Sequence, residues 1–391
     1  MKQAVILAAG EGKRLRPFTV TKPKAMLSIA GKPILGYVVE ALVQNGIRNI
    51  VLVVGYKREQ VFNYMGSGEQ FGIKITYVTQ QKQLGTANAL AQAKKAVEGE
   101  FLVLPGDKLI EADTIARFTA VKPEAVLVKR VDNPIRHGVV TIEGGKIRDI
   151  IEKPEEGKSS LVNTGMYAFS RGIFGFVELE LNIPDALNSM IAEGKYPKAH
   201  ETESTWLDVV YPWDILSLNS AILHRIPENL EGTIETGVSL QGQISVGKDT
   251  LIRSNSYIVG PAVIGEGCEI GPNVCILPAT SIADNVVVSP FTEIKNSVIG
   301  DDVNIGPGSI IEDSVIGKGC TIGGRFTACG GETEVKVNGE HHLVEVGAMV
   351  GESCSLGDSV TAEPGVIVGN YSRIKSLKLI SGRLPDRSLV V

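Results

Sequence analysis

An apolar residue recurs every six positions through the C-terminal half of this 391-residue chain. Eight consecutive members of the series are isoleucine or valine, and the series continues after two one-residue phase slips. These eight are Ile252, Ile258, Ile264, Ile270, Ile276, Ile282, Val288 and Ile294. A period of six fits neither an α-helix, with about 3.6 residues per turn, nor an alternating strand. It predicts a parallel β-helix, in which each hexapeptide forms one flat face and three faces close a coil.

The six-residue repeat is interrupted between about residues 324 and 346 and resumes at Val350. Two segments inside the interruption, 334–337 and 342–346, flank the pair Asn338-Gly339. Asn-Gly is the pair most typical of a type I′ turn between two antiparallel strands. The sequence therefore predicts a β-hairpin inserted into the β-helix.

The N-terminal part, up to about residue 225, has a different pattern, in which short apolar strands alternate with helices. Strands are predicted at 5–7, 50–54 and 101–104, and helices at 33–46, 86–97 and 211–223. This alternation is typical of an α/β fold with a mixed, mostly parallel, Rossmann-like sheet and helices on both faces. Because Pro227 ends the last helical pattern, we expect one domain at 1–228 and a second at 229–391.

Charge and composition narrow the class of protein. The net charge is −5, which argues against an extended basic surface for nucleic acid. No apolar run approaches the roughly 18 residues that a membrane-spanning helix needs. The five cysteines include no Cys-X-X-Cys pair, so they indicate neither a zinc knuckle nor a redox motif. We therefore expect a cytoplasmic protein that binds neither nucleic acid nor a membrane.

A glycine-containing loop with three cations follows the first predicted strand. The cations are Lys13, Arg14 and Arg16. A Walker A loop would need Ser or Thr at position 14, and a dinucleotide fingerprint would need glycine where Leu15 stands. The residues leave two interpretations, a solvated basic loop or a triphosphate clamp in which arginine forks the phosphate oxygens.

Two further signals lie at loops after predicted strands. Gln80 precedes Gly85 and Thr86, and an amide can both donate to and accept from the edge of a pyrimidine base. The alternative for this stretch is a plain helix N-cap at Thr86. Asp107 ends the central strand and Asp208 follows a later one. Two carboxylates can hold one Mg²⁺ together with substrate phosphates, although either alone can equally be a cap or a surface residue.

In this order, the motifs resemble those of the sugar-1-phosphate nucleotidylyltransferases over about residues 3–225. The matching stretches are Leu7–Arg16, Lys24, Gln80, Leu84-Gly85-Thr86, Gly106-Asp107, Gly138, Glu152-Lys153-Pro154, Asn163-Thr164-Gly165 and Asp208. The second half is similar to the left-handed β-helix of hexapeptide-repeat acyltransferases. Together the halves resemble the archaeal bifunctional N-acetylglucosamine-1-phosphate uridylyltransferase and glucosamine-1-phosphate acetyltransferase family.

The resemblance implies Mg²⁺-dependent transfer of a nucleotidyl group from a nucleoside triphosphate, expected to be UTP, to a sugar 1-phosphate, expected to be N-acetylglucosamine 1-phosphate. It implies catalytic roles for Arg14 and Lys24 and metal binding by Asp107 and Asp208. Implied nucleotide contacts are Leu7, Ala8, Ala9, Gly10, Gly12, Lys13, Gln80, Gly85 and Thr86. Implied sugar-phosphate contacts are Gly138, Glu152, Lys153, Asn163 and Thr164. Glucose-1-phosphate thymidylyl or uridylyl transfer, mannose-1-phosphate guanylyl transfer, and an inactive regulatory or scaffold subunit are the alternatives.

The second half departs from the bifunctional pattern. That family is expected to carry a histidine, followed three places later by tyrosine, in the stretch that reads Pro307–Ile311 here. His341 and His342 are the only histidines of the second half and lie in the predicted hairpin. They are either a replacement base, since histidine titrates near neutrality, or ordinary polar residues. Acetyl transfer from acetyl-CoA therefore stays open, and we expect the β-helix to act as a trimerisation core, removable without loss of nucleotidyl transfer. A homotrimer or a multiple of three is expected.

Overall fold

The computed structural model describes residues 1–132, 134, 137–152 and 159–391. The chain forms two compact units. Unit 1 contains Met1–Glu11, Lys22–Met26 and Ile34–Asp208, and unit 2 contains Gly12–Thr21, Leu27–Pro33 and Val209–Val391. Among the described residues, no helix combines the length and the hydrophobicity that a transmembrane segment requires.

Unit 1 is built on a nine-stranded sheet with the order β5-β4-β1-β6-β11-β8-β12-β10-β9. Its strands are β1 (Gln3–Ala8), β4 (Asn49–Val54), β5 (Lys74–Thr79), β6 (Glu100–Pro105), β8 (Ala125–Arg130), β9 (Gly138–Glu143), β10 (Lys146–Glu152), β11 (Leu161–Ser170) and β12 (Lys198–Thr202). As described, seven of these strands run in one direction, and β10 and β11 oppose them. The predicted mixed, mostly parallel sheet is confirmed.

Helices cover both faces of this sheet because side chains alternate along each strand. In β1, Ala4 and Ile6 join the core beneath α1 (Ile34–Gln44), α2 (Arg58–Met65) and α4 (Ala112–Thr119). Val5, between them, joins the opposite core with α3 (Thr86–Gln92), α5 (Phe174–Val177) and α6 (Ile183–Ala192). The helices predicted at 33–46 and 86–97 correspond to α1 and to α3, which continues as the short 3-10 helix η4 (Ala93–Lys95).

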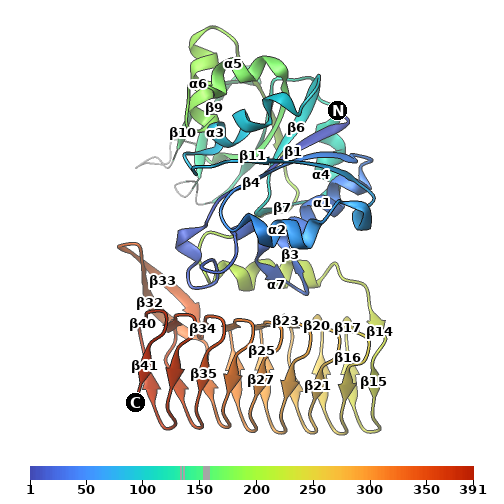
Figure 1. Cartoon of the computed structure of the whole chain (residues 1–391), viewed down its shortest axis with the longest axis vertical. Coiled ribbons are helices and arrows are strands. Elements are labelled where there is room, and N and C mark those ends of the chain that lie inside the picture. The colour runs from blue at the N-terminus through green and yellow to red at the C-terminus, as the bar shows by residue number, and fades with distance from the viewer. Residues whose placement is uncertain (133, 135–136, 153–158) are drawn as a thin grey trace. The chain divides into compact units, whose positions relative to one another are not determined.

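Unit 2 contains a left-handed parallel β-helix whose three faces are separate parallel sheets (Figure 1). Face 1 contains β14 (Asn229–Leu230), β17 (Ile244–Val246), β20 (Ala262–Ile264), β23 (Thr280–Ile282), β26 (Val298–Ile299), β29 (Val315–Ile316), β34 (Met349–Val350), β37 (Ile367–Val368) and β40 (Arg383–Leu384). Face 2 contains β15 (Thr233–Ile234), β18 (Leu251–Ile252), β21 (Glu269–Ile270), β24 (Val287–Val288), β27 (Asn304–Ile305), β30 (Thr321–Ile322), β35 (Ser355–Leu356), β38 (Arg373–Ile374) and β41 (Leu389–Val390). Face 3 contains β16 (Ser239–Gln241), β19 (Tyr257–Val259), β22 (Cys275–Ile276), β25 (Glu293–Lys295), β28 (Ile310–Glu312), β31 (Thr327–Ala328), β36 (Thr361–Ala362) and β39 (Leu379–Ile380).

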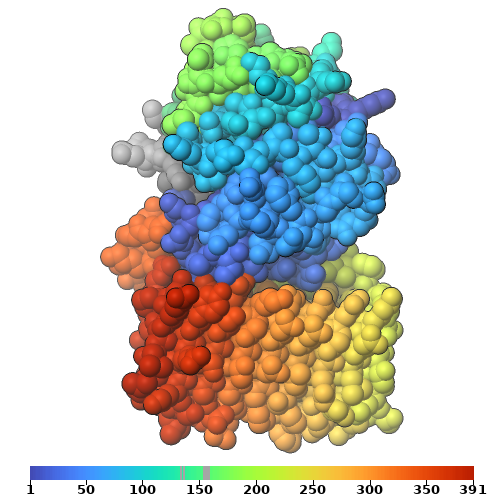
Figure 2. Space-filling model, in the orientation of Figure 1, coloured from blue at the N-terminus to red at the C-terminus, as the bar shows by residue number. Residues whose placement is uncertain are grey.

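The six-residue series forms the interior of the β-helix. Ile252, Ile270 and Val288 are register partners on face 2, eighteen residues apart, so three hexapeptides make one coil. Ile305 and Ile322 follow at intervals of seventeen. The phase slips in the sequence are therefore shorter corners, such as the one between β25 and β26, and the inward column stays in register. Figure 2 shows successive coils as adjacent bands from yellow to red.

The predicted hairpin is present as β32 (Gly331–Val337) and β33 (Glu340–Val346). Asn338 and Gly339 have φ of 52° and 90°, as a type I′ turn requires. The sequence placed the start of the interruption near 324, whereas Thr327–Ala328 still pairs within face 3. The hairpin is thus inserted only after the face 3 strand of this coil has been completed.

A helix and a short hairpin also belong to unit 2. They are α7 (Asp214–Leu223) and the pair β2 (Ser28–Ile29) and β3 (Lys32–Pro33). The amide of Asn219, in α7, donates to the carbonyl oxygen of Ala279 at 2.9 Å. Because α7 packs on the β-helix, it is grouped with unit 2, and the last change of unit along the chain falls between Asp208 and Val209.

Candidate active site

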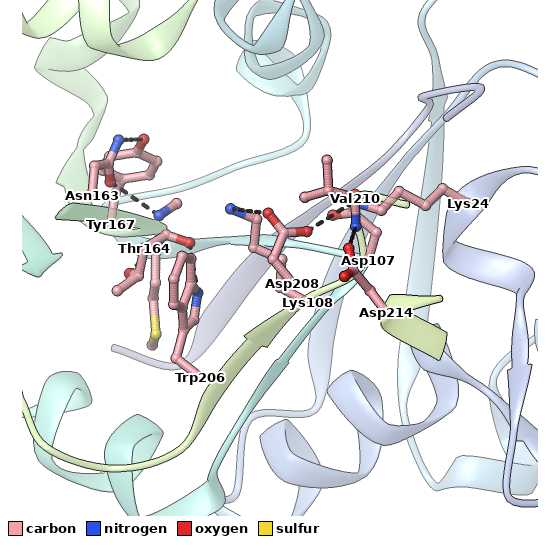
Figure 3. Close-up of polar contacts among 12 residues, drawn as sticks. Lys24, Asp107, Lys108, Asn163, Thr164, Tyr167, Trp206, Asp208, Val210 and Asp214 are labelled. Atoms are coloured by element: carbon pink, nitrogen blue, oxygen red, sulfur yellow. Dashed lines mark hydrogen bonds and ion pairs between the residues drawn. The ribbon is translucent and has the colours of Figure 1, made fainter. Parts of the chain in front are cut away.

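Two carboxylates and two ammonium groups meet in unit 1 (Figure 3). Lys24 Nζ lies 2.7 Å from an oxygen of Asp107 and 2.9 Å from an oxygen of Asp208. Lys108 Nζ lies 3.2 Å from the other carboxylate oxygen of Asp208. The side chain of Asp208 is only 12% exposed and that of Lys24 only 15%. Asp107 and Asp208, which the sequence singled out, thus both contact the ammonium group of Lys24, which the sequence also singled out.

Separate elements position this Asp-Lys cluster, defined as Lys24, Asp107, Lys108 and Asp208. Lys24 begins the 3-10 helix η2 (Lys24–Met26), and Asp107 lies in the turn after β6. β7 (Lys108–Ile110) pairs antiparallel with β13 (Trp206–Asp208), so that Asp208 stands opposite Lys108. The carboxyl ends of central strands are where open α/β sheets bind ligands, and the cluster lies just after such an end.

Within the cluster, the attraction between opposite charges outweighs the effect of burial on the pKa values. Burial alone would raise the pKa of Asp208, but the charges of Lys108 and Lys24 hold that pKa below its ordinary value. Burial alone would lower the pKa of Lys24, but Asp107 and Asp208 outweigh it and raise that pKa. Lys24 and Asp208 are therefore both ionised at neutral pH.

These shifts also fix the sign of the pH dependence. Because the pKa of Asp208 is depressed, its stabilising contribution is present above about pH 4 and is lost as the pH falls through the lower folded-state value. Because the pKa of Lys24 is raised, its contribution is present below about pH 10 and is lost as the pH rises through the higher folded-state value. The Lys24–Asp208 pair thus persists across the whole physiological range.

The glycine-containing loop passes from unit 1 to unit 2 between Glu11 and Gly12. The predicted nucleotide contacts Leu7, Ala8, Ala9 and Gly10 lie in unit 1, and Gly12, Lys13 and Arg14 lie in unit 2. Gly12 has φ of 74°, a left-handed conformation that favours glycine, and the 3-10 helix η1 (Lys13–Leu15) follows it. Leu15 is buried, which anchors the turn, while Lys13 and Arg16 are exposed and Arg14 is partly exposed.

Residues of the predicted base-binding stretch also contact other parts of the protein. Gly85 is required because a Cβ there would lie 2.2 Å from the carbonyl oxygen of Leu181, so its close approach is to the protein's own backbone. The amide nitrogen of Gln80 donates to the Gly85 carbonyl at 3.0 Å, and Gln80 is buried. The Thr86 hydroxyl does not cap its helix, because it accepts from the Ile183 backbone N–H at 2.9 Å.

The structure brings together three of the predicted sugar contacts. Gly138 and Glu152 are register partners in β9 and β10, and a Cβ on Gly138 would lie 2.7 Å from a carboxylate oxygen of Glu152. The same Cβ would lie 3.7 Å from the Cβ of Asn163. Glycine at 138 thus leaves space for the Glu152 carboxylate beside Asn163. Lys153 lies outside the described residues.

Buried hydrogen bonds hold Asn163 and Thr164, two of the predicted sugar-phosphate contacts. The Asn163 amide donates to the Tyr167 hydroxyl at 2.6 Å, and burial raises the pKa of Tyr167, so this hydroxyl keeps its proton. Thr164 is fully buried, and its hydroxyl donates to the carbonyl oxygen of Leu127 at 2.8 Å. Its own carbonyl accepts from the indole of Trp206 at 3.1 Å. The hydroxyl and the carbonyl of Thr164 are thus both bonded within the protein.

Sequence reasoning missed Lys108, Trp206 and Tyr167. Lys108 Nζ lies 4.9 Å from the centre of the Trp206 ring and also contacts Asp208. Its position directly after Asp107 was the available signal, but only the β7–β13 pairing shows that it faces the second aspartate. Tyr167 gave no signal, because its distance of four residues from Asn163 becomes a contact only through an irregularity in β11.

The two histidines considered as a replacement base have different surroundings. His341 is exposed, and its Nδ1 lies 3.1 Å from a carboxylate oxygen of Glu334. The His342 side chain is 11% exposed and packs against Tyr211 and Trp213, with ring centres 4.3 and 5.6 Å apart. His342 is therefore not an ordinary exposed hairpin residue.

Comparisons with known proteins cover both halves. The model of the nucleotidyl transferase family matches residues 3–225, and a model described as the GMPPB C-terminal domain matches residues 252–345. A crystal structure described as a glucose-1-phosphate thymidylyltransferase from Bacillus anthracis superposes with a TM-score of 0.53 at 30% identity. That match covers 58% of this chain and 97% of the other.

Two curated relatives are similar over almost their whole length. The bifunctional protein GlmU of Methanococcus maripaludis is 35% identical over 404 residues, which cover 99% of this chain and 96% of the relative. A bifunctional sugar-1-phosphate nucleotidylyltransferase/acetyltransferase of Sulfurisphaera tokodaii is 34% identical, with 95% of each chain covered. The chain belongs to the nucleotidyl transferase family.

Proposed function

We propose that this nucleotidyltransferase catalyses Mg²⁺-dependent uridylyl transfer from UTP to N-acetylglucosamine 1-phosphate, with release of pyrophosphate. The observation that carries the proposal is that Asp107 and Asp208 both contact the ammonium group of Lys24, and that the ammonium group of Lys108 also contacts Asp208. Such a cluster can exchange its internal ion pairs for a metal ion and substrate phosphates.

The reaction requires alignment and charge neutralisation rather than a general base. A phosphate monoester is largely ionised at pH 7, because its second pKa is about 6. A phosphate oxygen of the sugar phosphate attacks the α-phosphorus in line, and the bond to the bridging oxygen of pyrophosphate breaks with its electron pair. Lys24 would neutralise charge on the α-phosphate, and Arg14 would neutralise charge on the leaving pyrophosphate.

Asp107 and Asp208 fit a Mg²⁺ ion, which proteins usually hold with one or two carboxylates plus phosphate oxygens and water. In the part of the chain that the structure describes, no group of three or more His, Cys, Asp or Glu side chains could hold a metal. Substrate and water would therefore complete the shell. A Mg²⁺ ion bound there would neutralise phosphate charge, and Lys24 would exchange its carboxylate contacts for phosphate contacts.

The choice of sugar and base rests on the relatives, because two of them are named as GlmU and as a sugar-1-phosphate nucleotidylyltransferase/acetyltransferase. The test is a pyrophosphate-release assay with UTP, dTTP and GTP against the 1-phosphates of N-acetylglucosamine, glucose and mannose. We expect the highest kcat/KM for UTP with N-acetylglucosamine 1-phosphate. A tenfold preference for dTTP with glucose 1-phosphate would instead support the activity named for the Bacillus anthracis structure.

Acetyl transfer by the β-helix is not part of the proposed function. The stretch Pro307–Ile311 carries no histidine or tyrosine, and His342 packs against the rings of Tyr211 and Trp213, which stack on each other. We expect acetyl-CoA and glucosamine 1-phosphate to yield no free CoA above background in a thiol assay. Release that disappears when His341 and His342 are both changed to alanine would identify a replacement base. Release that survives this double change would reveal a base elsewhere.

We also propose that the protein assembles as a homotrimer or a multiple of three. Three flat faces favour threefold packing, and face 3 exposes Tyr257, Ile310 and Leu379 along one ladder of register partners. Light scattering at micromolar concentration should give three times the chain mass of 41.7 kDa, or a multiple of that value. A mass of one chain would contradict the proposal.

A further inference from the structure

The loop that carries Arg14 is fixed to two corners of the β-helix, within unit 2. The Thr21 hydroxyl donates to a carboxylate oxygen of Glu352 at 2.7 Å. The side-chain amide of Asn370 donates to the carbonyl oxygen of Pro17 at 2.9 Å, and this bond is buried. Two hydrogen bonds thus join a loop near the N-terminus to coils more than 300 residues later in the chain.

Glu352 and Asn370 occupy the same corner of adjacent coils, two residues after β34 and β37. The Asn370 side-chain oxygen accepts from the backbone N–H of Glu352 at 2.6 Å. At other corners an aspartate oxygen accepts from the backbone N–H of the preceding coil in the same way. Asp284 accepts from the Glu266 N–H at 2.8 Å, and Asp386 accepts from the Asn370 N–H at 2.7 Å. An aspartate at 370 would therefore still accept from the Glu352 N–H, but only the amide can donate to Pro17 and to the Asp386 carboxylate, 3.3 Å away.

Asn370 is more deeply buried than the residues at the equivalent corners of other coils. Lys248, Glu266 and Lys318, at the same corner of other coils, are exposed. Glu352 is half-buried, and Asn370 is fully buried. Glu352 thus resembles Asp301, which is also partly buried at this corner, whereas the full burial of Asn370 accompanies its bond to the loop.

Contacts within the loop also fix the residues on either side of Arg14. The Thr19 hydroxyl donates to the Gly12 carbonyl at 2.8 Å, and Thr19 and Leu15 are buried. Arg14 itself lies 3.9 Å from a carboxylate oxygen of Glu340 in the β32–β33 hairpin. The other oxygen of Glu340 accepts from the Tyr211 hydroxyl at 2.9 Å, which holds the carboxylate in place.

We propose that Asn370 and Glu352 are positioning residues for nucleotidyl transfer, which hold residues 12–21 so that Arg14 meets the triphosphate. This inference rests on the role assigned to Arg14 in the proposed function. Misplacement of a catalytic group by about 1 Å can cost on the order of 100-fold in rate. The β-helix is then part of the nucleotidyl transfer machinery as well as an assembly surface.

The test uses Asn370→Asp, which keeps the acceptor for the Glu352 N–H but removes the amide that donates to Pro17 and, at 3.3 Å, to Asp386. It also uses Thr21→Val, which removes the other bond from the loop side and leaves the contact with Asp386 intact. We expect each to lower kcat/KM for the nucleotide by about 10- to 100-fold. The KM for the sugar phosphate should stay within twofold. Thr21→Ser, which keeps the hydroxyl, should restore the rate. Hydrogen exchange in a peptide covering residues 12–21 should be faster in both impaired variants.

The matched controls are Asp284→Asn and Glu266→Ala, at the equivalent corner without the loop, and both should behave as wild type in exchange and in rate. Unchanged rates and exchange in Asn370→Asp and Thr21→Val, with an active wild type, would overturn the positioning role alone. A wild type inactive with every nucleotide would overturn the proposed function on which this role rests.

Discussion

Replacing Asp208 by asparagine should lower Mg²⁺-dependent pyrophosphate release by at least about a thousandfold, the upper range for removal of one charge-stabilising group. Asparagine keeps the shape of the side chain but removes the charge that Lys24 and Lys108 now neutralise. The same substitution at Asp107 should have an effect of similar size, because its carboxylate is the second one that contacts the ammonium group of Lys24. Pyrophosphate release at saturating substrates measures both losses.

The control for this experiment is Asp302→Asn. Asp302 also contacts a lysine, Lys318, at 3.2 Å, but on the β-helix. Its variant should keep the wild-type rate, and thermal unfolding should show that all three variants are folded. Near-normal turnover in Asp107→Asn or Asp208→Asn would remove that residue from the metal site.

Lys24→Ala should lower kcat by a factor on the order of 10²–10³, with a smaller change in KM for UTP. The ammonium group is buried between two carboxylates and stays protonated, so it is a fixed positive charge available to the α-phosphate. Its benefit is larger in the transition state, where charge develops on the transferred group. Steady-state kinetics with both substrates varied separate kcat from KM.

A lysine in an ion pair of comparable length provides the control for Lys24. Lys94 Nζ lies 2.8 Å from Glu178 on the surface of unit 1, and Lys94→Ala should leave kcat unchanged. A rise in KM for UTP with unchanged kcat in Lys24→Ala would mean that Lys24 binds the nucleotide equally in the ground state and the transition state.

Regular patterns were the most predictable parts of this fold. The period of six predicted the β-helix, because apolar residues, mostly isoleucine and valine, recur at the inward positions and each packs on its equivalent in the next coil. Asn338-Gly339 predicted its hairpin turn, since the left-handed conformation at both positions is a local property of these residues. Both patterns can be recognised from residues that lie close together in the sequence.

Features that depend on distant contacts could not be predicted. Gly85 was interpreted as space for a base, which stays a prediction, and nothing local shows that Leu181, nearly one hundred residues later, also excludes a side chain there. The loop at 12–21 was assigned to the first domain, and nothing local indicates that Asn370 donates to Pro17.

Calorimetric titration of UTP into the protein, with and without Mg²⁺, tests most directly whether the Asp-Lys cluster is the metal-dependent nucleotide site. We predict that Mg²⁺ strengthens UTP binding at least tenfold in the wild type and in Asp302→Asn. In Asp208→Asn, the Kd for UTP should be the same with and without Mg²⁺. Full enhancement by Mg²⁺ in Asp208→Asn and in Asp107→Asn would contradict this account.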